Sequence, residues 1–132
     1  MKQKLRIIAA SALAAVCLAV PASAYLSVGT STSYEVTTAY PNWNNKGESA
    51  WILNSSSNCQ FSATKTSGTG KATFAIYQWT TGNDYERGKW TSVDHVNATD
   101  LIGNPVASDD YYSKVTLTSG TSLKGNVKLS KK

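Results

Sequence analysis

Apolar and polar residues alternate along much of the chain after residue 25, in short segments separated by turn-forming residues. The segments CQFSATK at 59–65 and SLKGNVKL at 122–129 both show this period of two. In YYSKVTLT at 111–118, the alternation places Tyr112, Lys114 and Thr116 on the polar face. Such alternation is typical of strands with one buried and one solvated face, and no window shows the apolar spacing of a helix. The pattern therefore predicts an all-β protein.

Clusters of Gly, Pro, Asn, Asp and Ser interrupt the alternating segments and leave about seven strand candidates. These candidates span residues 34–40, 50–54, 59–65, 71–79, 89–96, 111–118 and 122–129. Short strands at this spacing predict a single antiparallel β-sandwich, either jelly-roll-like or immunoglobulin-like. Aliphatic residues are scarce, so aromatic side chains must supply much of the core. Trp51, in the strand-like sequence AWIL, is the clearest expected core aromatic.

The first 24 residues have the organisation of a secretory signal peptide. Three cations lie within the first six residues, an apolar run extends from Ile7 to Val20, and small residues lead to Ala24. The apolar run is shorter than the roughly 20 residues that span a bilayer. We therefore expect cleavage after Ala24 and a secreted, extracellular domain over residues 25–132, without stable membrane insertion.

The positive charge of the chain is concentrated in this leader. The full sequence has a formal net charge of +5, with 13 Lys and Arg against 8 Asp and Glu. Three of the cations precede residue 25, and the remaining lysines are scattered. Nucleic-acid binding needs a dense basic face that contacts many phosphates. The charge pattern therefore disfavours nucleic acid as a partner.

Few residues suggest catalysis or metal binding. His95 is the only histidine, which excludes sites built on several imidazoles, and no pair of acids stands out as the two carboxylates of a glycosidase. Cys59 lies in an alternating strand, so we expect a small buried thiol there and not a nucleophile activated by His95. Asp109 and Asp110 fit a solvated turn better than a calcium site. We expect no enzymatic activity, no metal and no cofactor.

The stretch IYQWTTGNDYERGKW, residues 76–90, places four aromatic residues around a charged turn. If strands 71–79 and 89–96 form a hairpin across the loop 80–88, Trp79 lies opposite Trp90. A shift of one residue would exchange the two faces of the hairpin. The predicted outer face carries Tyr77, Trp79, Trp90, Ser92 and Asp94.

This predicted face has two interpretations. Flat aromatic rings beside hydroxyl and carboxylate groups are typical of sugar-binding surfaces, on which rings stack against the apolar side of a pyranose. Alternatively, another strand or the segment 25–33 covers the rings, an interpretation that the scarcity of aliphatic residues favours. Trp43, in the polar segment 41–47, is a further candidate ligand-binding residue, because an exposed loop tryptophan needs a reason. It can equally pack over the end of the sandwich.

Within the segment from Val36 to Leu53, the sequence VTTAYPNW followed by SAWIL resembles the early strands of small secreted bacteriocins of the lactococcin type. Those proteins are β-sandwiches that act on the cell envelopes of related bacteria. The resemblance covers less than a fifth of residues 25–132. The chain is longer than members of that family and lacks histidines around the segment, so no functional residue is transferred from it.

Two functions follow as expectations. The first is a secreted, non-enzymatic binding protein that recognises an extracellular or cell-envelope ligand, with a glycan as the preferred class. The alternative, which the resemblance implies, is a secreted antibacterial or toxin-like protein that acts on the envelope of competing bacteria. The sequence leaves the oligomeric state open.

Overall fold

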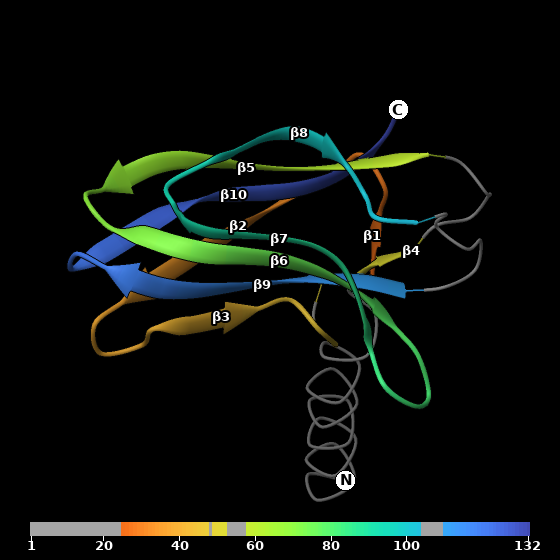
Figure 1. Ribbon diagram of the computed structural model, residues 1–132, viewed down its shortest axis with the longest axis horizontal. Helices are drawn as coiled ribbons and strands as arrows, with labels where there is room; N and C mark the ends of the chain where they lie inside the picture. Colours follow the sequence, from red (N-terminus) through yellow and green to blue (C-terminus); the bar gives the residue numbers. More distant parts are fainter. Residues whose placement is uncertain (1–24, 48, 53–57, 104–109) are drawn as a thin grey trace, which may run out of the picture.

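The structure, a computed structural model, describes residues 25–47, 49–52, 58–103 and 110–132. Within these ranges every regular element is a β-strand, and the strands form two packed sheets (Figure 1). This confirms the predicted all-β, sandwich-like class. The described residues form ten strands, however, where the sequence predicted about seven. The predicted signal peptide, residues 1–24, lies outside the described residues.

The first sheet has six strands in the order β1-β4-β9-β6-β7, with β3 also paired to β9. Its strands are β1 (Leu26–Ser27), β3 (Asn42–Asn44), β4 (Trp51–Ile52), β6 (Lys71–Trp79), β7 (Tyr85–Val93) and β9 (Asp110–Ser119). All pairs in this sheet are antiparallel except the short parallel pair of β1 and β4. The prediction of a purely antiparallel sandwich is therefore wrong at this edge.

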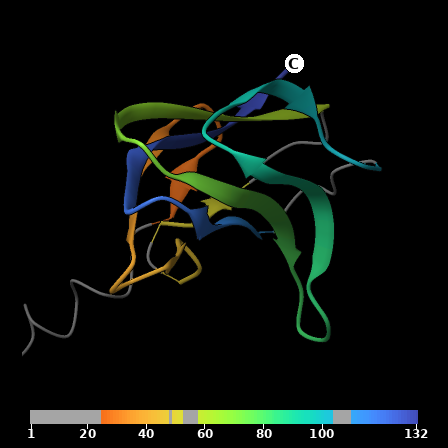
Figure 2. The same cartoon turned by 60° about the vertical axis from the view of Figure 1, so that its left-hand side comes forward.

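The second sheet has four strands in the order β2-β10-β5-β8. Its strands are β2 (Ser31–Thr37), β5 (Cys59–Gly68), β8 (Val96–Asp100) and β10 (Ser122–Lys131). Among the described strands, only the consecutive pairs β3–β4 and β6–β7 belong to the same sheet, so the chain changes sheets at every other connection. The turn between β6 and β7 projects beyond the end of the first sheet (Figure 2).

The core lies between the two sheets and is rich in aromatic side chains. Trp51 is fully buried, and its indole Nε1 donates a hydrogen bond to the Thr30 carbonyl oxygen at 2.8 Å. The inward residues of the alternating segments 59–63 and 123–129 are also buried, Cys59 among them. These observations confirm the predicted burial of Trp51 and Cys59 and the period-two assignment of both segments.

The predicted strand 34–40 ends earlier than expected. Tyr34 and Val36 are buried, but β2 stops at Thr37 and the Tyr40 side chain is 77% exposed. A turn causes this, because the Thr37 N–H donates to the Tyr40 carbonyl at 3.0 Å and the Tyr40 N–H donates to the Thr37 hydroxyl at 3.1 Å. The chain then enters the first sheet through β3.

Gly125 allows a close approach between β10 and β5. The pairing register of the two strands shifts between Lys124 and Gly125. A Cβ atom at position 125 would lie 1.8 Å from the Thr64 carbonyl oxygen and 2.9 Å from the Tyr34 hydroxyl. Only glycine leaves space for the backbone of Thr64 here, which is a common use of glycine at a bulge.

Candidate functional site

The β6–β7 hairpin forms, but its register differs from the predicted one. Trp90 lies opposite Phe74 and not opposite Trp79, whose partner on the other side is Asp110 of β9. Two features cause the difference. Strand β7 begins at Tyr85, so the connection is shorter than the predicted loop 80–88, and the register shifts at two points along the pair. The predicted pairing of Trp79 with Trp90 is therefore wrong.

The new register separates Trp90 from Tyr77 and Trp79. The Trp90 ring stacks on Phe61 of the second sheet, with ring centroids 5.3 Å apart and an interplanar angle of 17°. Trp90 thus packs against the core between the sheets. Tyr77 and Trp79 alternate with the buried residues Ile76 and Gln78, so they lie on the outer face of the first sheet.

Asp94 also lies apart from the predicted face. It follows the end of β7, where its carboxylate forms an ion pair with Lys65 at 3.2 Å and contacts the His95 Nδ1 at 2.7 Å. The pKa of Asp94 is lowered, first by the hydrogen bond to His95 and then by the one to Lys65. The carboxylate is already engaged by two side chains.

Trp43 does not project from an exposed loop. It belongs to β3, opposite Val115, and is partly buried against the core. Its ring centroid lies 6.1 Å from that of Tyr34. Trp43 and Tyr34 line a groove of about 370 Å³ that also contains Glu35 and Lys124, which form an ion pair at 3.4 Å. The alternative from sequence, in which Trp43 packs over the end of the sandwich, is therefore right about packing but wrong about the place, because Trp43 lies within a strand of the first sheet.

Tyr77 and Trp79 share the outer face of the first sheet with Tyr112 of β9, and we call these three residues the aromatic cluster. The rings of Tyr77 and Tyr112 stack at 5.3 Å with an interplanar angle of 19°. Trp79 meets Tyr112 edge to face at 6.5 Å and 83°. All three side chains are partly buried. The sequence placed Tyr112 on the polar face of its strand but did not identify it as a neighbour of Tyr77.

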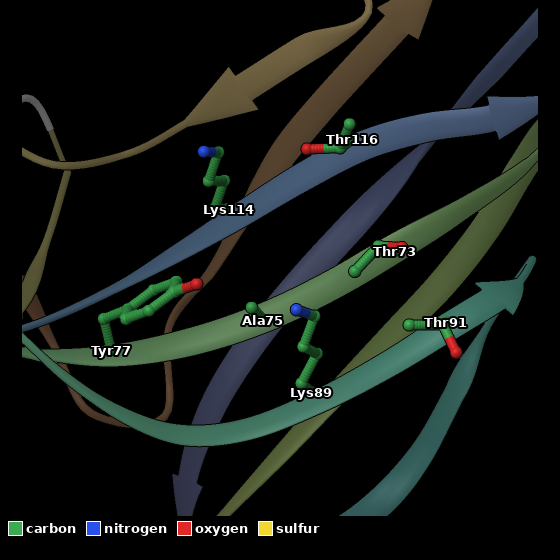
Figure 3. Close-up of a pocket in the computed structure, with 7 residues that line it drawn as sticks. All are labelled: Thr73, Ala75, Tyr77, Lys89, Thr91, Lys114 and Thr116. Carbon is green, nitrogen blue, oxygen red and sulfur yellow. The ribbon is translucent and has the colours of Figure 1, made fainter.

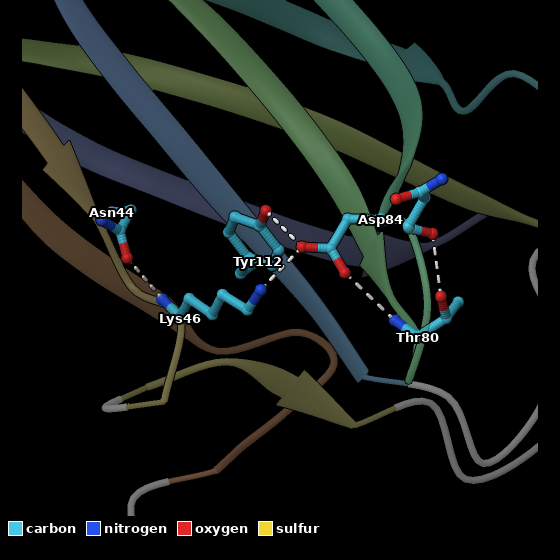
Figure 4. A network of polar contacts seen from close by, with 6 residues as sticks. Asn44, Lys46, Thr80, Asp84 and Tyr112 are labelled. Carbon is cyan, nitrogen blue, oxygen red and sulfur yellow. Dashed lines mark hydrogen bonds and ion pairs between the residues drawn. The ribbon is translucent and has the colours of Figure 1, made fainter.

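A polar network fixes one side of the aromatic cluster (Figure 4). The Asp84 Oδ2 atom accepts hydrogen bonds from the Lys46 ammonium at 2.7 Å and from the Tyr112 hydroxyl at 2.8 Å. Its Oδ1 atom accepts the Thr80 N–H at 3.2 Å. The Lys46 ammonium also lies 4.9 Å from the Trp79 ring centroid and 5.1 Å from that of Tyr112. The network thus joins the turn after β6 to the segment after β3.

These contacts change the acidity of the groups involved. The pKa of Asp84 is lowered, chiefly by the hydrogen bond from Lys46, and the hydrogen bonds from Tyr112 and the Thr80 N–H act in the same direction. The pKa of Tyr112 is raised by burial first and by the hydrogen bond to Asp84 second. Burial and the neighbouring Glu86 raise the pKa of Tyr77. Asp84 is therefore ionised, and both tyrosines are neutral, over the physiological pH range.

An open groove of about 290 Å³ extends from Tyr77 along the outer face of the first sheet (Figure 3). Ala75 of β6 lies in its middle, between Lys89 of β7 and Lys114 of β9. Three threonines contribute hydroxyl groups. The residues lining the groove are Thr73, Ala75, Tyr77, Lys89, Thr91, Lys114 and Thr116. Tyr77 belongs both to the groove and to the aromatic cluster, so the two form one continuous surface.

The side chains of the described residues offer little for metal binding, since they contain no group of three or more His, Cys, Asp or Glu residues that could hold an ion. Asp109, one of the two acids of the expected solvated turn, lies outside the described residues. In the same part of the chain, no helix is long and apolar enough to cross a membrane.

Comparison with known proteins finds no family model that matches the sequence and no curated protein that is similar to it.

Proposed function

We propose that this protein is a secreted, non-enzymatic β-sandwich that binds an extracellular or cell-envelope glycan on the outer face of its first sheet. Secretion rests on the organisation of residues 1–24. The observation that supports the binding site is the continuity of the aromatic cluster with the open groove through Tyr77. Of the residues proposed from sequence, Tyr77 and Trp79 are retained, while Trp43, Trp90 and Asp94 are assigned to packing or to ion pairing.

The chemistry of this face suits a sugar. A pyranose has an apolar side made of C–H bonds, which packs against an aromatic ring, and a rim of hydroxyls, which need hydrogen-bond partners. Tyr77 supplies the ring, and its stacking on Tyr112 fixes the ring orientation before any ligand arrives. Thr73 and Thr91 line the groove with residues that carry hydroxyls, and Thr116, whose hydroxyl donates to the Asn42 Oδ1 atom at 3.0 Å, keeps only its acceptor capacity. A ring whose orientation is already fixed in the free protein loses little conformational freedom on binding, which favours affinity.

The acids of this face are held in structural contacts, which favours binding over hydrolysis. Asp84 is ionised and bonded to Lys46 and Tyr112. Glu86 accepts a hydrogen bond from the Tyr77 hydroxyl at 3.3 Å. Glycoside hydrolysis needs one carboxyl group held protonated as a general acid beside a second, ionised one. A lowered pKa makes Asp84 a poor general acid.

The experiment is a glycan-array screen followed by titration calorimetry with Tyr77→Ala. Loss of a central binding aromatic should cost about 1–2 kcal/mol, or roughly a five- to thirtyfold loss of affinity. Tyr40→Ala is the matched control, because Tyr40 is an exposed tyrosine on the turn between β2 and β3. It should bind as the unmodified protein does. No binding to any glycan, or equal affinity of the two variants, would refute the proposal.

The antibacterial alternative requires a different result. If the purified protein inhibits the growth of related bacteria and binds no glycan of the array, the envelope-directed function implied by the resemblance at residues 36–53 replaces the present proposal. Inhibition that disappears in Tyr77→Ala, together with glycan binding, would place both activities on the same face.

A further inference from the structure

The groove holds two cations whose charges are not balanced within the described structure. Four lysines form ion pairs with acidic side chains, namely Lys46, Lys65, Lys124 and Lys132. Among the described residues, Lys89 and Lys114 form no such pair, and both side chains are exposed. They rise from β7 and β9 on either side of β6, and no acid lines the groove between them. Two like charges facing one groove favour an anionic occupant.

We propose that the groove binds an acidic polysaccharide whose sugar rings carry carboxylates, with the carboxylates placed between Lys89 and Lys114. This inference rests on the proposed function and specifies its ligand class. A uronate unit combines a pyranose ring, which can lie over Ala75 toward Tyr77, with a negative charge at the edge of the ring. Ala75 is the smallest of the lining residues, so no bulky side chain stands between Lys89 and Lys114 on β6.

Two other anionic partners fit the groove less well. A nucleic acid is held by many phosphate contacts, whereas this groove offers two ammonium groups. A poly(glycerol phosphate) chain carries the charge but has no ring in its backbone to pack on Tyr77. The threonine hydroxyls and the aromatic ring therefore favour a polyuronate, and the other two polymers become comparisons in the experiment.

The experiment compares polyuronates with their methyl esters, which keep the sugar backbone and remove the charge. Polygalacturonate, alginate and hyaluronan, each paired with its ester, are titrated into the full secreted protein by calorimetry. We expect the acid form of at least one polymer to bind about tenfold more tightly than its ester. For solvent-exposed charges, each of K89Q and K114Q should weaken that binding about two- to fivefold, and the double variant should abolish the preference.

K128Q is the matched control, since Lys128 is an exposed lysine on β10 of the opposite sheet and the change removes the same charge. Its affinity should stay within about twofold of the unmodified protein. Raising the salt concentration should weaken binding of the acid form more in the unmodified protein than in K89Q/K114Q, because salt screens exposed charges.

The outcomes separate this inference from the proposed function. Equal binding of acids and esters, or an acid preference that persists in K89Q/K114Q, overturns the inference while glycan binding stands. Tighter binding of poly(glycerol phosphate) or single-stranded polynucleotide than of any polyuronate also overturns it. If no polyuronate binds and the glycan array shows no binding, both proposals are refuted.

Discussion

Asp84→Asn tests whether the polar network stabilises the candidate site. The substitution keeps the size of the side chain but removes its negative charge. The Asp84 carboxylate pairs with Lys46 and accepts a hydrogen bond from the Tyr112 hydroxyl, and both interactions are weakened when the side chain is neutral. The Asp84 side chain is 18% exposed and that of Lys46 is 36% exposed, so solvent screens the ion pair and its contribution is about 0.5 kcal/mol. The charged hydrogen bond from Tyr112 adds about 1 kcal/mol. We expect a total loss of about 1–2 kcal/mol in the free energy of unfolding.

The same variant has a defined pH dependence. The pKa of Asp84 is lowered from its ordinary value of 3.8 in the folded protein, so ionised Asp84 stabilises the fold above that value. This stabilisation is lost as the pH falls through the lowered folded-state pKa. The difference between the unmodified protein and Asp84→Asn should therefore be constant above about pH 5 and shrink toward zero in stronger acid. Other acids titrate equally in both proteins and cancel.

Urea unfolding followed by tryptophan fluorescence measures both effects. A double-mutant cycle with Lys46→Gln should give a coupling energy of about 0.5 kcal/mol near neutral pH, which isolates the Lys46 contribution. Glu35→Gln, which neutralises an exposed acid of the second sheet paired with Lys124, is the control and should cost less than about 0.5 kcal/mol. A loss for Asp84→Asn below about 0.3 kcal/mol, or one that does not change with pH, would refute the stabilising role of the network.

Three further predictions follow from packing. Trp90→Ala should lower the free energy of unfolding by about 2–4 kcal/mol in urea titrations, because the ring stacks on Phe61. The glycan affinity of the folded variant should be unchanged. A loss of binding without a loss of stability would contradict the assignment of Trp90 to packing. Cys59 should react with thiol reagents only after unfolding, and rapid labelling or a disulfide-linked dimer on a non-reducing gel would show otherwise. Gly125→Ala should destabilise the fold by about 3 kcal/mol or more, since the added Cβ would clash with the Thr64 carbonyl oxygen. A free energy of unfolding equal to that of the unmodified protein would disprove the close approach.

Alternation was sufficient to predict the strands at 59–65, 111–118 and 122–129, because each buries one face and leaves the other in water. Composition was also sufficient to place Trp51 in the core, since few aliphatic residues are present to fill it. Both inferences depend on local sequence and on the hydrophobic effect alone. They required no knowledge of which strands are neighbours.

The hairpin register could not be derived from the same signals. Tyr85, Glu86 and Arg87 have the polarity of a loop, but they begin β7, which lies at the edge of its sheet, where charged side chains are common. The register shifts along the β6–β7 pair leave no mark in the hydrophobic pattern. A small error in the strand start therefore moved Trp90 to the wrong face.

The residues of the candidate site come from separate parts of the chain. Lys46 and Asp84 are 38 positions apart, and no local pattern connects them. Alternation placed Tyr112 and Lys114 on a polar face, but their proximity to Tyr77 and Lys89 depends on the strand order β9-β6-β7. Only the sheet topology brings these side chains together.

Lysine footprinting tests the location of the binding face most directly. The full protein is acetylated with and without saturating polyuronate, and modification at each lysine is measured by mass spectrometry. Lys89 and Lys114 should be protected by the ligand, whereas Lys128 on the opposite sheet should react equally in both samples. Protection of Lys128 to the same degree, or no protection of Lys89 and Lys114, would contradict a binding site on the outer face of the first sheet.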